Sequence, residues 1–108
     1  MEKVIINLIQ NSSEAFIFNK SEKRNISISI KSGYNYAIIR FKDDAGGAED
    51  KILDKIFEPY FTTKHQSNGT GLGLFMSKMI IEKSLDGTIE AKNSDSGLEF
   101  IIKIPLGE

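Results

Sequence analysis

The sequence has no cysteine, no excess of either charge and no long apolar run, and each of these absences excludes a class of protein. Without cysteine the chain has neither a disulfide framework nor a thiolate metal site, which fits a reducing compartment. Fourteen Lys and Arg stand against fifteen Asp and Glu, giving a net charge of −1. Because no basic field attracts polyanions, we expect no nucleic-acid partner and no direct contact with a membrane.

The pattern of apolar residues predicts neither a transmembrane helix nor a signal peptide. Runs such as residues 4–6 and 79–81 fall far short of the ~20 apolar residues that span a bilayer. The apolar stretch near the N-terminus is interrupted by Asn7, Gln10 and Asn11, so it lacks the continuous core of a signal peptide. We expect a cytoplasmic location, with a parent protein that can be membrane-anchored outside these residues.

What is present is the composition of one globular domain. With 108 residues, 40% hydrophobic and 27% charged, the chain is large enough for a single core and is unlike disordered or fibrous sequences. We therefore treat residues 1–108 as one domain.

The spacing of apolar residues predicts an alternation of helices and hairpins. Helical spacing predicts a helix over residues 1–18, with Ser12 as the one polar residue inside its apolar stripe. Residues 26–31 and 36–42 alternate like strands around a turn at residues 32–35. A short helix over residues 50–57 is stopped by Pro59, and residues 19–24 form a loop.

The C-terminal half repeats this plan. A second major helix is expected over residues 72–85, with Leu72, Met76, Met79 and Ile80 on related faces, ending near Asp86 and Gly87. Residues 88–92 and 98–104 predict another hairpin. Together these elements predict an α/β fold, a two-layer sandwich in which helices cover one face of a mixed, mostly antiparallel sheet.

Four groups of residues in this scaffold suggest chemistry, each with a plainer alternative. On the first helix, Asn7, Asn11 and Glu14 fall within an arc of roughly 60°. Mg²⁺ prefers oxygen ligands and needs only one or two from protein when phosphates supply the rest. A single amide oxygen from this face is therefore sufficient, although the same pattern also describes a solvated polar face.

The second group is the turn Asp43-Asp44-Ala45-Gly46-Gly47 at a predicted strand end. A carboxylate only accepts hydrogen bonds, so it suits the exocyclic amine of adenine, and glycine lets backbone approach a flat base. An ordinary surface turn has the same composition.

Two further groups follow along the chain. A polar loop that contains Lys64 follows the aromatic residues Phe57, Tyr60 and Phe61. This pattern suits a lid whose lysine contacts ligand phosphates. Alternatively, the aromatic residues belong to the core and the lysine is solvated. The turn Gly69-Thr70-Gly71-Leu72-Gly73-Leu74 then opens the second helix, where free N–H groups favour anions. The turn matches neither a Walker loop nor a dinucleotide fingerprint.

In this order, the four groups resemble the ATP-binding domain of sensor histidine kinases, which has the Bergerat fold shared with DNA gyrase and heat-shock chaperone ATPases. NLIQNSSEA resembles the N box and DDAGG the first glycine box. KIFEPYFTTK resembles the F box, and GTGLGLFMSKMIIEK the second glycine box. The resemblance runs through nearly the whole chain.

The resemblance implies ATP and Mg²⁺ as cofactors and gives each motif a role. Asn11 would be the Mg²⁺ ligand, with Asn7 beside it near the phosphates as the other catalytic asparagine. Asp43 would accept the adenine amine within the glycine box that also contains Ala45 and Gly47. The phosphates would be held by the second glycine box and the lid over residues 62–68, through Lys64, Gly69, Thr70, Gly71, Leu72 and Gly73.

The sequence departs from the family pattern in the glycine box, at the N-terminus and in its histidine. Ala45 replaces the middle glycine of Asp-x-Gly-x-Gly. Family members place a further helix and two strands before the N-box helix, so we expect a truncated domain whose uncovered sheet edge promotes self-association. His65 is the one histidine, and it lies in the expected lid.

The resemblance implies partners in addition to ATP. The phosphate acceptor would be a histidine on the separate dimerisation domain of the parent kinase, and a response regulator would act downstream. We therefore expect this chain alone to bind nucleotide without autophosphorylating. Two alternatives remain: an ATPase or anti-sigma serine kinase of the same fold, and a nucleotide-incompetent, self-associating module.

Overall fold

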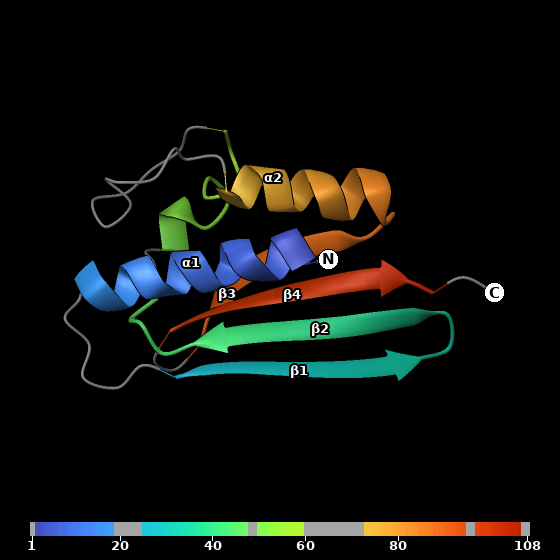
Figure 1. Ribbon diagram of the computed structural model, residues 1–108, viewed down its shortest axis with the longest axis horizontal. Helices are drawn as coiled ribbons and strands as arrows, with labels where there is room; N and C mark the ends of the chain where they lie inside the picture. The colour runs from blue at the N-terminus through green and yellow to red at the C-terminus, as the bar shows by residue number, and fades with distance from the viewer. Residues whose placement is uncertain (1, 19–24, 48–49, 60–72, 95–96, 107–108) are drawn as a thin grey trace.

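A four-stranded sheet forms one layer of the protein and helices form the other (Figure 1). This computed structural model describes residues 2–18, 25–47, 50–59, 73–94 and 97–106. The strands are β1 (Ile26–Gly33), β2 (Tyr36–Asp43), β3 (Thr88–Asn93) and β4 (Leu98–Pro105). Their order is β1-β2-β4-β3 and each pairing among them is antiparallel, which confirms both expected hairpins.

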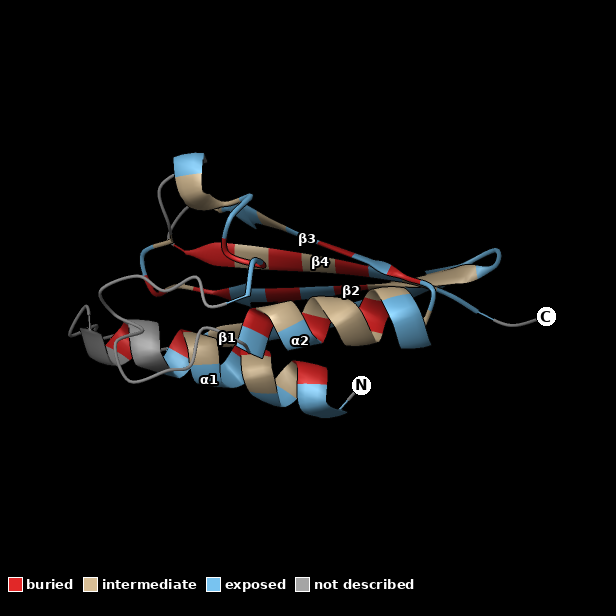
Figure 2. Ribbon diagram, turned by 90° about the horizontal axis from the view of Figure 1, so that it is seen from above, coloured by how far each residue is buried: buried red, intermediate tan, exposed pale blue. Residues whose placement is uncertain are grey.

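Alternation of side chains along the strands builds one buried face. Phe41 of β2 lies opposite Phe100 of β4, and Ile39 lies opposite Ile102. These four residues are buried, and the buried positions alternate with less buried ones along β4 (Figure 2). Because successive strand side chains point to opposite faces, the apolar alternation in the sequence fixes which face meets the helices.

Helix α1 (Glu2–Phe18) covers that face with a narrow buried row. Val4, Leu8, Ser12 and Phe16 are buried at intervals of four residues, which is close to one helical turn. Ile9 of the expected apolar stripe is 39% exposed, so the stripe is narrower than its apolar residues suggest. None of the helices in the described parts of the chain is long and apolar enough to cross a membrane.

Helix α2 (Gly73–Met79) continues as the π-helical segment η3 (Ile80–Ser84) and lies beside α1 (Figure 1). Its buried row is Leu74, Ser77 and Ile81, whereas Met76 is 48% exposed. Apolar spacing alone does not select this buried row, because the row contains a serine. The predicted end is confirmed: Asp86 has a φ of 54° and the Gly87 N–H donates to the Ile81 carbonyl at 2.8 Å.

The helix expected over residues 50–57 is instead one 3₁₀ turn, η1 (Asp50–Ile52), followed by isolated turns. The Lys55 N–H donates to the Ile52 carbonyl at 2.9 Å, and the Glu58 N–H donates to the Lys55 carbonyl at 3.0 Å. So short a segment gains little from helix formation alone. It is held by packing, with the Phe57 ring centroid 6.0 Å from that of Phe100.

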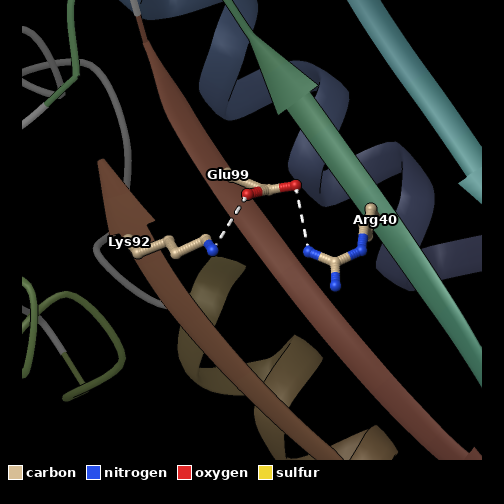
Figure 3. Close-up of polar contacts among 3 residues, drawn as sticks. All are labelled: Arg40, Lys92 and Glu99. Carbon is tan, nitrogen blue, oxygen red and sulfur yellow. Dashed lines mark ion pairs between the residues drawn. The ribbon is translucent and has the colours of Figure 1, made fainter. Parts of the chain in front are cut away.

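The opposite face of the sheet carries charged side chains. Figure 3 shows Glu99 of β4 between Arg40 of β2 and Lys92 of β3, at 3.5 and 3.7 Å. The side chains of Arg40 and Lys92 are 45% and 57% exposed, so solvent screening leaves these pairs little weight in stability. They complement cross-strand register rather than form a site.

Candidate functional site

Asp43, at the end of β2, is the most enclosed charged residue of the candidate site. Asp43 is 4% exposed, and its carboxylate accepts three hydrogen bonds from the described residues. Oδ2 accepts from the Ser12 hydroxyl at 2.6 Å, while Oδ1 accepts from the N–H groups of Ala45 at 3.0 Å and Leu98 at 3.2 Å. These donors fix the carboxylate and occupy three of its roughly four acceptor positions.

The turn between β3 and β4 closes over this carboxylate. A Cβ atom added to Gly97 would lie 1.9 Å from the Asp43 carbonyl oxygen and 2.7 Å from its Oδ1. A Cβ atom on Gly47, whose φ is +74°, would lie 2.5 Å from Oδ1 of Asn93. Gly97 therefore allows close backbone packing that a side chain would block, whereas at Gly47 the positive φ is what favours glycine.

The structure explains why alanine is accepted in the glycine box. Ala45 is 3% exposed, and positive φ values in this box occur at Gly46 and Gly47, not at Ala45. Its N–H still donates to Asp43. The departure from the family pattern therefore leaves the carboxylate and the box conformation in place.

The two adjacent aspartates have different environments. The Asp44 carboxylate accepts from the backbone N–H and the side-chain Nδ2 of Asn25, both at 2.9 Å and at an exposed position. Asp43 instead points into the space between β2, β4 and α1. Asp43, unlike Asp44, is therefore enclosed by the fold between α1 and β4.

Helix α1 links the site residues through two polar contacts one and a half turns apart. Ser12, next to Asn11, donates to Asp43 as described above. Asn7 donates from Nδ2 to the Gly73 carbonyl at 3.2 Å and to the Ser77 hydroxyl at 3.1 Å. One helix therefore brings the N box against both the first glycine box and the start of α2.

Six of the expected site residues are among those the structure describes: Asn7, Asn11, Asp43, Ala45, Gly47 and Gly73. The others, together with the expected lid over residues 62–68, lie outside the described residues: Lys64, Gly69, Thr70, Gly71 and Leu72. His65 lies outside them as well.

Three residues of the site did not stand out in the sequence as functional: Ser12, Ser77 and Gly97. Ser12 and Ser77 are both 0% exposed and both hydrogen-bond to a predicted site residue. Their position within an otherwise apolar helical row could have identified these two serines, because a buried hydroxyl is nearly always hydrogen-bonded.

The candidate site residues Asn11 and Asp43 carry side-chain oxygens. In the described residues there is no group of three or more His, Cys, Asp or Glu that could hold a metal ion. Mg²⁺ brought in with phosphates needs only one or two protein oxygens, and half-buried Asn11 provides an amide oxygen beside Ser12. The fixed carboxylate of Asp43 suits an amine donor.

Comparison with known proteins agrees with this geometry. The family model described as histidine kinase-, DNA gyrase B- and HSP90-like ATPase matches residues 1–108. The two-component sensor PprA of Pseudomonas aeruginosa is 34% identical over 98% of this chain and 12% of that protein. The chain thus spans only a small part of this curated relative.

Solved structures extend the match to the fold. The catalytic domain of the histidine kinase ThkA is 35% identical, with a TM-score of 0.77 over 94% of this chain and 63% of that one. ThkA in complex with the response regulator TrrA is 32% identical, with a TM-score of 0.73 over 96% of this chain and 28% of that one. The chain therefore belongs to the histidine kinase-, DNA gyrase B- and HSP90-like ATPase family, as a catalytic domain of the sensor histidine kinase type.

Proposed function

We propose that this chain binds ATP·Mg²⁺ and presents the γ-phosphate to a histidine on the dimerisation domain of a two-component sensor kinase. The observation that carries the proposal is the buried Asp43 carboxylate, oriented by Ser12 of the helix that also carries Asn11. A nucleotide bound there would have its base at Asp43 and its phosphates toward Asn11.

Each residue has a defined part in this proposal. Asp43 accepts a hydrogen bond from the exocyclic amine, through the acceptor position of Oδ2 that the described donors leave open. Asn11 contributes one oxygen to Mg²⁺, which neutralises charge on the phosphates. Phosphoryl transfer depends mainly on such positioning and charge stabilisation, so this domain needs no nucleophile of its own.

The acceptor and the downstream partner lie in other domains. The kinase ThkA forms a complex with a response regulator, and by analogy we propose that a response regulator receives the phosphoryl group from the parent of this chain. The chain alone is expected to hold ATP without phosphorylating itself. Incorporation of labelled phosphate at His65 would contradict that expectation.

Titration calorimetry with a non-hydrolysable ATP analogue and Mg²⁺ tests the proposal. The wild-type chain should bind, and Asp43→Asn should weaken binding by roughly tenfold or more, because an amide donor then faces the adenine amine. Asp44→Asn is the matched control, since it makes the same change at the neighbouring residue, which contacts Asn25. It should bind like the wild type.

Two outcomes would contradict the proposal. The absence of both heat and a thermal shift at millimolar nucleotide would favour the nucleotide-incompetent module. Equal weakening by Asp43→Asn and Asp44→Asn would mean that general charge, not the buried carboxylate, attracts the ligand. The alternative of an ATPase or anti-sigma serine kinase is less favoured, because IFEPYFTTK and the matched sensor kinases agree on the histidine kinase type.

We also propose that the chain self-associates through β1. This strand lies at the end of the sheet order, and its helix-side residues Ile28 and Ile30 are 47% and 68% exposed. Ile26, Ile28 and Ile30 place no charge on that side to prevent edge-to-edge pairing. Two copies paired antiparallel along β1 would extend the sheet and shield these side chains.

Sedimentation velocity over a concentration series tests this association. The wild type should form a dimer, and Ile30→Lys should be monomeric because it places charge on the pairing side. Thr88→Lys makes the same kind of change at the exposed start of β3, on the other edge of the sheet, and should still dimerise. A wild-type monomer at high concentration would contradict the proposal.

A further inference from the structure

The face of the sheet that points away from the helices, here called the outer face, carries more positive than negative charge. Ile39, Phe41 and Asp43 of β2 are buried, so the residues that alternate with them point outward. The registers extend this outward set across all four strands. Its charged members are two acidic and five basic residues: Glu90, Glu99, Lys31, Arg40, Lys42, Lys92 and Lys103.

Charge is separated between the outer face and the rest of the chain. Five basic and two acidic residues give the outer face a net charge of +3. The whole chain has fourteen basic and fifteen acidic residues, so nine basic and thirteen acidic residues remain elsewhere, with a net charge of −4. Basic residues are therefore gathered on one side of a chain that has no overall positive charge.

The carboxylates of the outer face leave some of its lysines uncompensated. The Glu99 side chain is 12% exposed and already pairs with Arg40 at 3.5 Å and with Lys92 at 3.7 Å (Figure 3). Lys42 lies opposite Glu99 in the register of β2 and β4, yet neither Lys42 nor Lys31 forms an ion pair within the described parts of the chain. Because like charges on one sheet face repel, an acidic partner would relieve this repulsion.

The neighbours of these lysines indicate which kind of anion fits. Half-buried Ile38 lies between Lys31 and Lys103 in the registers and offers apolar contact area. The aromatic ring of Tyr36 has the Lys103 Nζ atom 4.1 Å from its centroid. This lysine occupies ring surface on which a nucleic-acid base would stack, and stacking is a main source of affinity for single strands. The carboxylate of Glu90 would also repel a phosphate backbone.

We infer that the outer face binds an acidic protein surface, through Lys31, Lys42 and Lys103. A spacing of ~4.8 Å between strands and a rise of ~3.4 Å per residue make the face about 14 Å wide and about 24 Å long. That footprint is typical of transient rather than permanent complexes. Complementary charge accelerates encounter and selects the partner in such complexes. The inference goes beyond the proposed function, because the outer face lies on the opposite side of the sheet from the Asp43 side chain.

Fluorescence anisotropy of a labelled oligoglutamate peptide tests the inference on the wild-type chain. The peptide should bind at low ionic strength and dissociate as salt is added. The Lys31→Gln, Lys42→Gln double variant should bind about fivefold more weakly, because it removes two exposed charges from the outer face. The matched control is Lys3→Gln, Lys83→Gln, which makes the same change in net charge at exposed residues of the helical layer. Its affinity should stay within about twofold of the wild type.

A change of the opposite sign gives a second readout on the same face. Glu90→Gln removes an exposed carboxylate from β3 and should tighten peptide binding by about twofold. Glu58→Gln makes the same change at an exposed residue outside the sheet and should leave the affinity unchanged.

Three results would overturn the inference. The first is absence of peptide binding by the wild type at low salt, and the second is equal weakening in the two double variants. The third is tighter binding of labelled single-stranded DNA or of phosphatidylserine vesicles than of the peptide, since the face would then fit a nucleic acid or a membrane. None of these measurements involves ATP, so a failure of nucleotide binding would overturn the proposed function alone.

Discussion

The two polar contacts of α1 differ in burial and in length. At Ser12 the helix meets a charged group through a 2.6 Å hydrogen bond, with both residues buried. At Asn7 it meets α2 through neutral groups at 3.1 and 3.2 Å, at a part-buried to exposed position. The difference indicates that the end that would hold the base is built rigidly into the core, whereas the end toward the phosphates depends on weaker bonds.

The largest expected effect is at the base end, in the turn that closes over Asp43. Gly97→Ala places a Cβ atom 1.9 Å from the Asp43 carbonyl oxygen, so the backbone must move. We expect a loss of about 3 kcal/mol in the free energy of unfolding, measured by urea titration. Gly33→Ala is the matched control, because no atom lies within 4 Å of its added Cβ. Equal stability of the two variants would contradict this account of the turn.

Next in size is the removal of the Ser12 hydroxyl. Ser12→Ala leaves the buried Oδ2 of Asp43 without its donor from α1. Hydrogen bonds to charged groups contribute more than neutral ones, so we expect a loss of about 2 kcal/mol in unfolding free energy. Urea titration of the variant against wild type gives the value, and an unchanged midpoint would show that the carboxylate does not need this donor.

The same substitution at the other contact should cost less. Ser77→Ala removes an equally buried hydroxyl, but its partners are neutral and the Gly73 carbonyl keeps its bond from Asn7. We expect a loss of about 1 kcal/mol under the same conditions. A larger loss of unfolding free energy in Ser77→Ala than in Ser12→Ala would contradict the stronger hydrogen bond expected at Ser12.

The smallest effect is expected in the glycine box. Ala45→Gly restores the family pattern at a residue whose φ is not positive, so it gains no backbone relief and only adds freedom to the unfolded chain. Stability should fall by about 0.5–1 kcal/mol while affinity for the ATP analogue stays unchanged. Calorimetry showing markedly tighter binding would mean that Ala45 restricts the site.

Sequence reasoning was most successful where a period repeats. Both hairpins and the two main helices follow from alternation and helical spacing, and the position of Asp43 at a strand end follows from the hairpin. These features are local, so neighbouring residues alone specify them. The fold class was predicted for the same reason and is confirmed by the ThkA structures.

Prediction failed where packing between distant segments decides the outcome. Apolar spacing did not select Ser77, which is buried in α2 and accepts a hydrogen bond from Asn7, whereas Met76 is exposed. The short segment over residues 50–57 follows the packing of Phe57 rather than helical propensity. Likewise, no local pattern shows that Gly97 must lie against Asp43, which precedes it by more than fifty residues.

The central claim is that Asp43 accepts a hydrogen bond from the adenine amine. Calorimetry comparing ATP with purine riboside triphosphate, which lacks only that amine, tests the claim directly. The wild-type chain should prefer ATP by roughly tenfold or more, and Asp43→Asn should lose this preference because its amide no longer accepts at that position. Equal affinities of the wild type for the two nucleotides, or the same preference in Asp43→Asn, would contradict the claim.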